Sequence, residues 1–280
     1  MTGTDKAFTS YDIHACLYDT RRVELFQQAI QEIVQPGDIV VDAGSGSGVL
    51  GLLAAAAGAG RVYCIELNGE FVPVIEEHAR RNGFADRVVA IHADATTVAL
   101  PEPVDIIISE VISAGFFYEP QLQILDNLRR FLKPGGSIVP LAMDNWIELI
   151  DAQDKLYGLT FNYDSRFAML AGDRSLTTKA SYLLTDFHER TGSYISSGVT
   201  VRSVRSGVAN ALRITYRIRF TETLESAEPT DFLLNPQIIF LSEPVVLDQD
   251  EEYHVSIGYE ASSSPLSATI KVDPVPGKAR

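Results

Sequence analysis

Glu110 and Glu119 are the residues whose type and spacing most directly indicate chemistry in this sequence. They bracket the stretch SEVISAGFFYE, in which only apolar, small and aromatic residues separate the two acids. Carboxylates placed in this way can each accept a fork of N–H bonds from a planar cation such as a guanidinium. Two surface glutamates on a solvated loop are the alternative, and the residues upstream decide between these interpretations.

A glycine-rich turn, VVDAGSGSGVLG, follows the first predicted strand and opens a helix. Gly44 and Gly46 allow a tight turn and a close approach of a ligand to the backbone, as in NAD-binding domains. Asp42 precedes the first glycine, Glu66 ends the next strand and Asp94 follows the third strand. Such acids can accept hydrogen bonds from ribose hydroxyls and an adenine amino group. Together they favour a nucleoside cofactor, S-adenosylmethionine (SAM).

Strand and helix patterns alternate up to about residue 140. The predicted strands are DIVVDAG, RVYCIEL, RVVAIHAD and VDIIISE, and the predicted helices between and after them are VLGLLAAAAGA, VPVIEEHARRNG and QLQILDNLRRFL. A further helix in residues 1–35 has one apolar stripe that includes Val23, Phe26 and Ile30. This alternation is typical of an α/β domain with a mostly parallel, Rossmann-like sheet covered by helices on both faces.

The pattern changes near Pro140 to a period of two residues. ALRITYRIRFTET and EEYHVSIGYE alternate apolar and polar side chains, which predicts strands of an antiparallel β-barrel. The expected organisation is therefore an N-terminal helical lid in residues 1–35, a cofactor-binding domain in residues 36–140 and a β-barrel substrate domain in residues 141–280.

Composition narrows the possible partners. The formal net charge of −14 argues against nonspecific binding of nucleic acid and is compatible with a cationic substrate. Cys16 and Cys64 are the two cysteines, and without a Cys/His cluster we predict no metal site. The longest apolar run is too short to span a bilayer, so no membrane association is expected. We see no targeting signal and expect a cytoplasmic enzyme.

Over about residues 8–140 the sequence resembles the protein arginine methyltransferase family, a class I SAM-dependent group. VDIIISEVISAGFFYE is similar to the double-glutamate loop of that family, and LYDTRR fits its LxDxxR pattern. The resemblance implies that Glu110 and Glu119 bind and activate a substrate guanidinium. It also implies that Arg22 binds the methionine carboxylate of SAM.

The same resemblance implies a C-terminal β-barrel and a homodimer. FTSY is similar to part of the family's aromatic lid, although Ala7 stands where the family has its first tyrosine. We expect Tyr11, Phe116 and Tyr118 to line the substrate pocket, because aromatic faces attract cations. Phe117 is expected to pack in the core. His14 is a candidate acid or base, with a structural role as the alternative.

Two departures from the family concern the substrate side. The segment at about residues 155–185 is shorter than the family's dimerisation arm, so the substrate is expected to be small or flexible: free arginine, a peptide or a natural-product guanidine. The loop EPTDFLLNPQ lacks the family's Thr-His-Trp histidine, the partner of the acid that matches Asp19. Asn235 and Asp231 are candidates to replace it.

Several other functions fit part of the pattern. A SAM-dependent methyltransferase acting on a metabolite amine or phenol would keep the glycine turn, Glu66 and Asp94, and methylation of protein arginine would keep every motif. A non-catalytic protein on a degenerate methyltransferase fold, or an aminopropyltransferase with an acidic pocket, would also share the fold.

Overall fold

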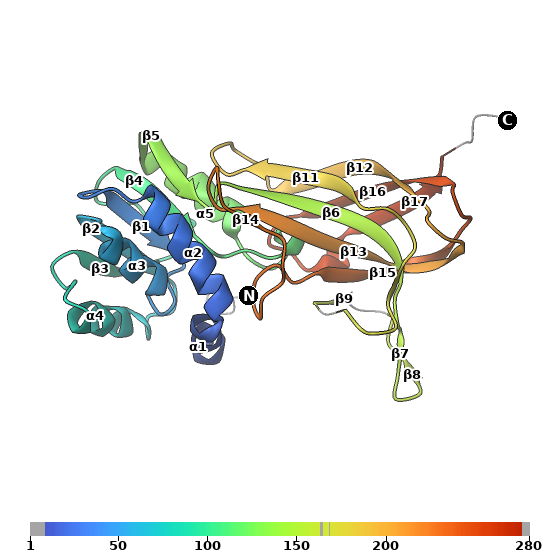
Figure 1. The fold of residues 1–280 in the computed structure, drawn as a ribbon, viewed down its shortest axis with the longest axis horizontal. Helices are drawn as coiled ribbons and strands as arrows, with labels where there is room; N and C mark the ends of the chain where they lie inside the picture. The colour runs from blue at the N-terminus through green and yellow to red at the C-terminus, as the bar shows by residue number, and fades with distance from the viewer. Residues whose placement is uncertain (1–8, 163–164, 168, 276–280) are drawn as a thin grey trace.

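The structure is a computed structural model that describes residues 9–162, 165–167 and 169–275. A helix-covered parallel sheet forms one end of the molecule, and elongated antiparallel sheets form the other (Figure 1). Residues of both parts belong to one continuous buried cluster, so the two parts share a core. We propose that the domain border lies near Pro140, between the last parallel strand and the first long antiparallel strand.

A five-stranded parallel sheet carries the N-terminal part. Its strands lie in the order β3-β2-β1-β4-β5. Their bounds are β1 Ile39–Ala43, β2 Arg61–Glu66, β3 Val88–His92, β4 Val104–Ser109 and β5 Leu132–Val139. Parallel pairing puts the carboxyl ends of β1, β2, β3 and β4 on one edge, which is where ligands bind in open α/β sheets.

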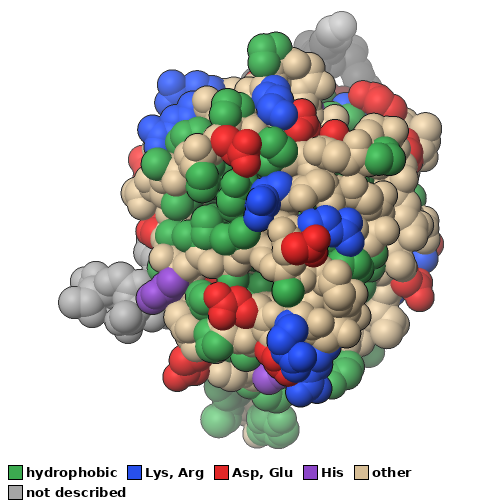
Figure 2. Space-filling view, turned by 90° about the vertical axis from the view of Figure 1, so that its left-hand side faces the viewer, with side chains coloured by type: hydrophobic (Ala, Val, Ile, Leu, Met, Phe, Trp, Pro, Cys, Tyr) green, Lys and Arg blue, Asp and Glu red, His purple; other side chains and the backbone are tan. Residues whose placement is uncertain are grey.

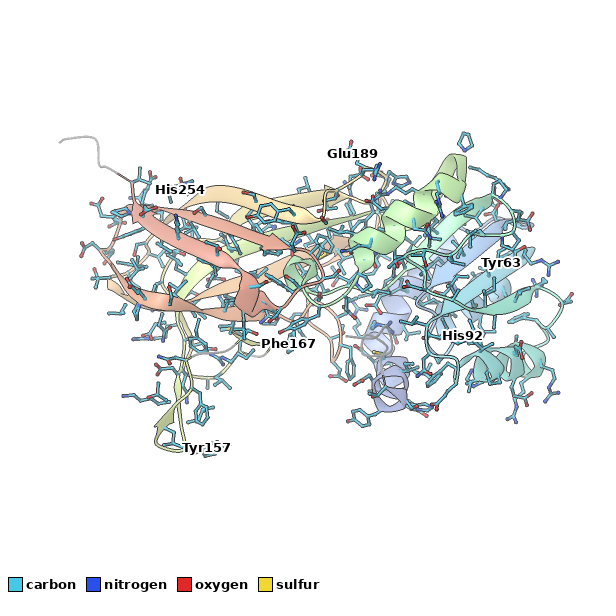
Figure 3. All side chains as sticks on the ribbon, turned by 180° about the vertical axis from the view of Figure 1, so that it is seen from behind. Tyr63, His92, Tyr157, Phe167, Glu189 and His254 are labelled. Carbon is cyan, nitrogen blue, oxygen red and sulfur yellow. The ribbon has the colours of Figure 1, made fainter. Side chains whose placement is uncertain are left out.

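Five α-helices, within the part of the chain that the structure describes, surround this sheet. They are α1 Ser10–Tyr18, α2 Thr20–Ile33, α3 Val49–Ala57, α4 Val72–Arg81 and α5 Gln121–Leu128. Helices α2 and α3 lie on one face of the sheet and α5 lies on the other (Figures 1 and 3). The alternation of strands and helices predicted from the sequence is confirmed.

The N-terminal helical region consists of two helices because the chain turns at Asp19. This residue ends α1 and is the N-cap of α2, where its carboxylate accepts a hydrogen bond from the Arg22 backbone N–H over 3.1 Å. Such a cap satisfies one of the free N–H groups at the start of a helix. The break gives α1 a direction of its own and leaves both Asp19 and Arg22 buried at the bend.

The C-terminal part is built from antiparallel sheets, as predicted. The larger sheet has the order β10-β6-β13-β15-β9, with β11 paired to β6 and β14 paired to β13, and a second sheet has the order β12-β16-β17. The long strands are β6 Ala142–Asp151, β11 Ala180–Asp186, β12 Tyr194–Arg202, β13 Gly207–Arg219, β15 Gln237–Leu247, β16 Glu252–Glu260 and β17 Thr269–Pro274. The short strands are β9 Ser165–Arg166, β10 Arg174–Ser175 and β14 Glu225–Ser226.

The arm-like segment contains a short hairpin. Strands β7 Lys155–Leu156 and β8 Leu159–Thr160 pair with each other, and Tyr157 at the tip is 96% exposed. Figure 3 shows Tyr157 far from the body of the protein, with Phe167 between the hairpin and the helix-covered end. Exposed apolar side chains on a projecting hairpin are typical of a surface that another molecule covers.

Acidic and basic side chains are interspersed on the face of the helix-covered end (Figure 2). Among the described residues, no helix combines the length and apolar character needed to cross a bilayer.

Candidate active site

A buried glutamine holds together the two ends of the loop that carries Glu110 and Glu119. The Gln121 side-chain oxygen accepts hydrogen bonds from the Ser109 hydroxyl over 3.0 Å and from the Val111 backbone N–H over 3.1 Å. Its amide nitrogen donates to the Ser109 carbonyl over 3.1 Å. These bonds join the end of β4 to the start of α5, so the loop between them closes and both glutamates face one cavity.

Within this loop the backbone takes left-handed conformations at Gly115, Phe116 and Tyr118, with φ of 65°, 57° and 62°. A Cβ atom at Gly115 would lie 2.9 Å from the hydroxyl oxygen of Tyr182, so only glycine fits. The turn sends the Phe116 ring into the core, where it is fully buried and packs edge-to-face on Phe187.

The expectation that Phe116 lines the substrate pocket is therefore corrected, because its ring is fully buried and lies outside the lining of the cavities that contain the two acids. Phe117 packs in the core as predicted and stacks on Tyr259 with ring centroids 4.2 Å apart. Tyr118 is 43% exposed and lines the cavity that contains both glutamates.

The charges at the centre of the site are unevenly paired. Glu110 accepts a hydrogen bond from the guanidinium of Arg22, and both side chains are almost completely buried. Among the described residues, the Glu119 carboxylate has neither a hydrogen bond nor an ion pair. Burial raises the pKa of Glu119 to about 7, against the opposing effect of the Arg22 charge. With Glu119 ionised, these three side chains sum to one negative charge.

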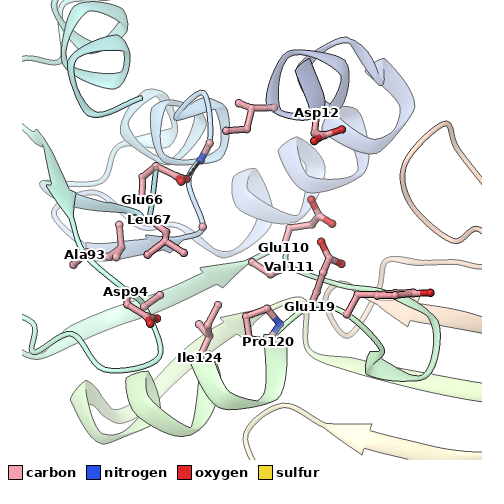
Figure 4. A pocket seen from close by; sticks show the side chains of 16 residues that line it. Asp12, Glu66, Leu67, Ala93, Asp94, Glu110, Val111, Glu119, Pro120 and Ile124 are labelled. Carbon is pink, nitrogen blue, oxygen red and sulfur yellow. Dashed lines mark hydrogen bonds between the residues drawn. The ribbon is translucent and has the colours of Figure 1, made fainter. Parts of the chain in front are cut away.

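A cavity of about 390 Å³ joins this acid pair to the ends of the parallel strands. Gly44, Gly46, Glu66 and Asp94 line it together with Glu110 and Glu119. In Figure 4 the carboxylates of Glu110 and Glu119 lie side by side, while Glu66 and Asp94 lie toward the opposite wall. The residues predicted from separate motifs are thus brought to one place.

Glu66 and Asp94 are fixed in position but keep capacity to accept further hydrogen bonds. The Glu66 oxygens accept backbone N–H bonds of 2.7 Å from Gly46 and from Asn68. One Asp94 oxygen accepts from the N–H and hydroxyl of Thr96, and its other oxygen has no donor among the described residues. A carboxylate has about four acceptor positions, so both acids can still bind hydroxyl or amino groups.

The glycine turn brings the backbone to the edge of the cavity. Gly44 has φ of 77°, and a Cβ atom there would lie 2.6 Å from a methyl group of Val111. Asp42, by contrast, is outside the lining of this cavity. Its buried carboxylate accepts a hydrogen bond from the Gly51 backbone N–H over 2.9 Å, and burial raises its pKa to about 6. We predicted that Asp42 contacts the cofactor; in the structure it instead connects the glycine turn to α3.

Arg22 lies in a smaller adjoining cavity of about 110 Å³, which Gly44, Gly46, Glu110 and Glu119 also line. Its Nε atom is buried and has no hydrogen-bond partner among the described residues. A buried donor of this kind is costly to leave unpaired, so it is suited to an anionic group of a ligand. Together with Glu66 and Asp94, Arg22 completes a set of residues that fits SAM: acids for the nucleoside and a cation for the amino-acid carboxylate.

The loop that lacks the family's histidine still binds Asp19, through a residue that the sequence did not single out. The Thr230 hydroxyl donates to the Asp19 carboxylate over 2.5 Å, and the Phe232 backbone N–H donates over 2.9 Å. Neither candidate from the sequence takes this role, because Asn235 instead donates to the Asp231 carbonyl over 3.1 Å. The loop between β14 and β15 is thereby joined to the bend between α1 and α2.

The remaining predicted residues lie near the N-terminus. Tyr11 on α1 is 79% exposed and lies outside the lining of these cavities, so its predicted contact with substrate stays a prediction. Ala7 and Phe8 of the expected lid lie outside the described residues. The His14 ring bonds to the Ser10 carbonyl within α1, which accords with the structural alternative.

Three contributions were not predicted from the sequence. Gln121 holds the two ends of the glutamate loop together, Thr230 donates a hydrogen bond to Asp19, and Asp12 of α1 lines the cofactor cavity. Gln121 could have been found, since it is the first residue of the helix that begins two residues after the second glutamate. The contact of Thr230 with Asp19 spans most of the chain and has no local signal.

Comparison with known proteins agrees with this geometry. Residues 40–136 match a family described as "Methyltransferase domain". A probable protein arginine N-methyltransferase 6 of Arabidopsis thaliana is 38% identical over 126 residues, which cover 44% of this chain and 28% of that protein. An arginine N(omega)-methyltransferase of Streptomyces achromogenes subsp. streptozoticus is 36% identical over 137 residues, which cover 46% of this chain and 37% of that protein. This chain therefore spans well under half the length of these relatives.

The likeness in fold extends over nearly the whole chain. A structure described as the Trypanosoma brucei PRMT1 enzyme-prozyme heterotetrameric complex with AdoHcy superimposes with a TM-score of 0.75. The match covers 92% of this chain and 96% of that chain at 18% sequence identity. At this identity the match concerns the fold alone, which includes the antiparallel part.

The parallel sheet, the glycine turn and the acids at the strand ends define a class I SAM-dependent methyltransferase. The predicted cofactor, S-adenosylmethionine, is confirmed at the level of this class. Within the class, the chain is similar over less than half of its length to proteins named arginine N-methyltransferases, and its fold is similar to that of solved structures with such names.

The Asp19 contact predicts a loss of stability in the variant Thr230→Val. Valine keeps the shape of threonine but removes the donor to Asp19, and it also removes the acceptor for the Leu233 N–H. We expect the free energy of unfolding, measured by urea denaturation, to fall by about 1–3 kcal/mol, because a buried carboxylate loses a donor. Thr230→Ser keeps the hydroxyl and should lose less than half as much. Equal stability of Thr230→Val and the wild type would contradict this account.

Proposed function

We propose that this protein is a SAM-dependent arginine N-methyltransferase that transfers a methyl group to a guanidino nitrogen. The substrate we propose is free arginine, an arginine-containing peptide or a small natural-product precursor. The observation that carries this proposal is the half-buried carboxylate of Glu119, which has no partner among the described residues and lies beside the Arg22–Glu110 ion pair. One bound guanidinium would neutralise that cluster, which in its absence keeps one uncompensated charge.

A guanidinium attacks a methyl group poorly because its positive charge is spread over three nitrogens and its pKa exceeds about 12. Glu110 and Glu119 can accept N–H bonds from two of those nitrogens and draw positive charge toward them. The electrons of the remaining nitrogen become more available, and the two acids hold that nitrogen in line with the reacting carbon. Bound SAM supplies the methyl group as a sulfonium.

We assign Glu119 a second role, as the base that accepts a proton during methyl transfer. The nitrogen that gains a methyl group must release one of its protons, and a nearby base has to accept it. Because burial raises the pKa of Glu119 to about 7, its carboxylate is a stronger base than an exposed glutamate. Glu110 keeps its charge stabilised by Arg22, so the two acids differ in role: Glu110 holds the substrate, and Glu119 both holds it and accepts the proton.

The relatives support the choice of a guanidine over another amine. The Streptomyces relative is named for methylation of arginine at the ω position, and the Arabidopsis relative is named a protein arginine methyltransferase. We further propose a homodimer, because the exposed Tyr157 and Leu159 of the β7–β8 hairpin fit a surface covered by a second copy.

Glu110→Gln and Glu119→Gln test the proposed role of the acids. Each variant keeps the side-chain shape and removes one negative charge, so we expect kcat with a guanidine substrate to fall at least about 100-fold. The Kd of Glu119→Gln for SAM, measured by calorimetry, should stay within about threefold of the wild type. Glu243→Gln, an exposed acid far along the chain, is the matched control. A kcat of Glu119→Gln within about threefold of the wild type would remove the basis for the assignment.

The raised pKa of Glu119 predicts how activity depends on pH. Below pH about 7 the folded protein holds this carboxyl protonated and neutral, so it can neither pair with a guanidinium nor accept a proton. The value of kcat/KM should therefore rise with pH through about 7. Because bound guanidinium favours the ionised form, the matching rise in kcat should occur at lower pH.

The pH dependence of the residual activity of Glu119→Gln shows whether the rise in kcat/KM comes from Glu119 or from titration of Asp42, whose pKa is about 6. In the variant the rise near pH 7 should disappear, whereas an unchanged profile would assign it to another group.

A further inference from the structure

Glu119 separates the cofactor side of the site from a second, outer cavity of about 380 Å³. Glu119 lines the cofactor cavity, the Arg22 cavity and this outer cavity, whereas Glu110 lines only the first two. A guanidine held by both acids would therefore extend the rest of its molecule into the outer cavity. The chemistry of that cavity should select what the far end of the substrate carries.

Three aromatic side chains from distant parts of the sequence meet at this outer cavity. Tyr118 belongs to the glutamate loop, Phe167 follows β9, and Phe232 belongs to the loop between β14 and β15. Each is 42–55% exposed, and the rings of Tyr118 and Phe167 lie 5.5 Å apart between centroids. Exposed aromatic rings grouped around a cavity are suited to bind a cation against their faces.

The polar groups of the same cavity are acidic or neutral. Asp231 and Asn235 line it, and among the described residues no lysine, arginine or histidine does. The Asn235 side-chain nitrogen donates to the Asp231 carbonyl over 3.1 Å, which holds this part of the loop. The Asp231 carboxylate has no ion-pair partner among the described residues. A carboxylate on the far end of a substrate would meet Asp231 without any compensating cation.

We infer that the outer cavity selects a small guanidine whose far end is a cation, such as a guanidinoalkylamine, over one that ends in a carboxylate. The protonated amine would lie against the rings of Tyr118, Phe167 and Phe232, close to Asp231. This inference rests on the proposed function, because it takes the guanidine to be held by Glu110 and Glu119. It narrows the proposed substrates by disfavouring free arginine.

Three matched compounds test the inference with the full-length enzyme and SAM. They are 4-aminobutylguanidine, its N-acetyl derivative, and arginine, which adds a carboxylate to the first compound. We expect kcat/KM for 4-aminobutylguanidine to exceed both others by about tenfold, from ring contacts and the nearby acid. The N-acetyl derivative represents the neutral amide that a peptide presents at this position.

Two variants locate the source of the preference. Asp231→Asn should reduce the ratio of kcat/KM between 4-aminobutylguanidine and arginine at least about fivefold, because it removes attraction for the amine and repulsion of the carboxylate. Glu228→Gln, an exposed acid in the same loop that lies outside the cavity lining, should leave the ratio unchanged.

The results that would contradict the inference differ from the result that would contradict the proposed function. Methylation of arginine as fast as 4-aminobutylguanidine, or faster, would overturn the inference while leaving guanidine methylation intact. A preference for the N-acetyl derivative would overturn it in favour of a peptide substrate. An enzyme that binds SAM but methylates none of the three guanidines would instead contradict the proposed function.

Discussion

The unequal pairing of two half-buried glutamates with one buried arginine is the constraint on which the site depends. Arg22 satisfies Glu110 and leaves Glu119 with a raised pKa and no partner among the described residues. Burying an unpaired charge is costly unless a ligand compensates it, so the cluster is prepared for a cation rather than for stability. Binding and proton transfer then follow from the same feature.

Both domains are needed to maintain this arrangement. The parallel sheet positions the start of the glutamate loop, and Gln121 draws the other end back to it. The β domain fixes the turn between them, since Asn145 accepts the Gly115 N–H over 2.8 Å. The β14–β15 loop holds Asp19 at the helix bend, three residues before Arg22. A shift of either domain would therefore move one member of the charge cluster relative to the others.

Much of the fold and part of the site could be predicted because their signals are local. The glycine turn, Glu66 and Asp94 follow strands, and parallel strands bring their carboxyl ends together. Phe116 could not be placed, because its burial depends on packing against Phe187, which is distant in the sequence. Asp42 was misassigned because an acid beside a glycine turn can accept a hydrogen bond either from a ligand or from a backbone N–H of the following helix. The Thr230 contact depends on tertiary packing between residues at opposite ends of the chain.

Mass spectrometry of the reaction product tests the central claim most directly. Purified enzyme would receive SAM with a deuterated methyl group and a guanidine substrate, and fragmentation would locate the label. The account predicts that the label appears on a guanidino nitrogen and that Glu119→Gln forms at most about one hundredth of the product in the same time. Label on an α-amino group, a hydroxyl or a carbon, with the guanidine unmodified, would contradict it.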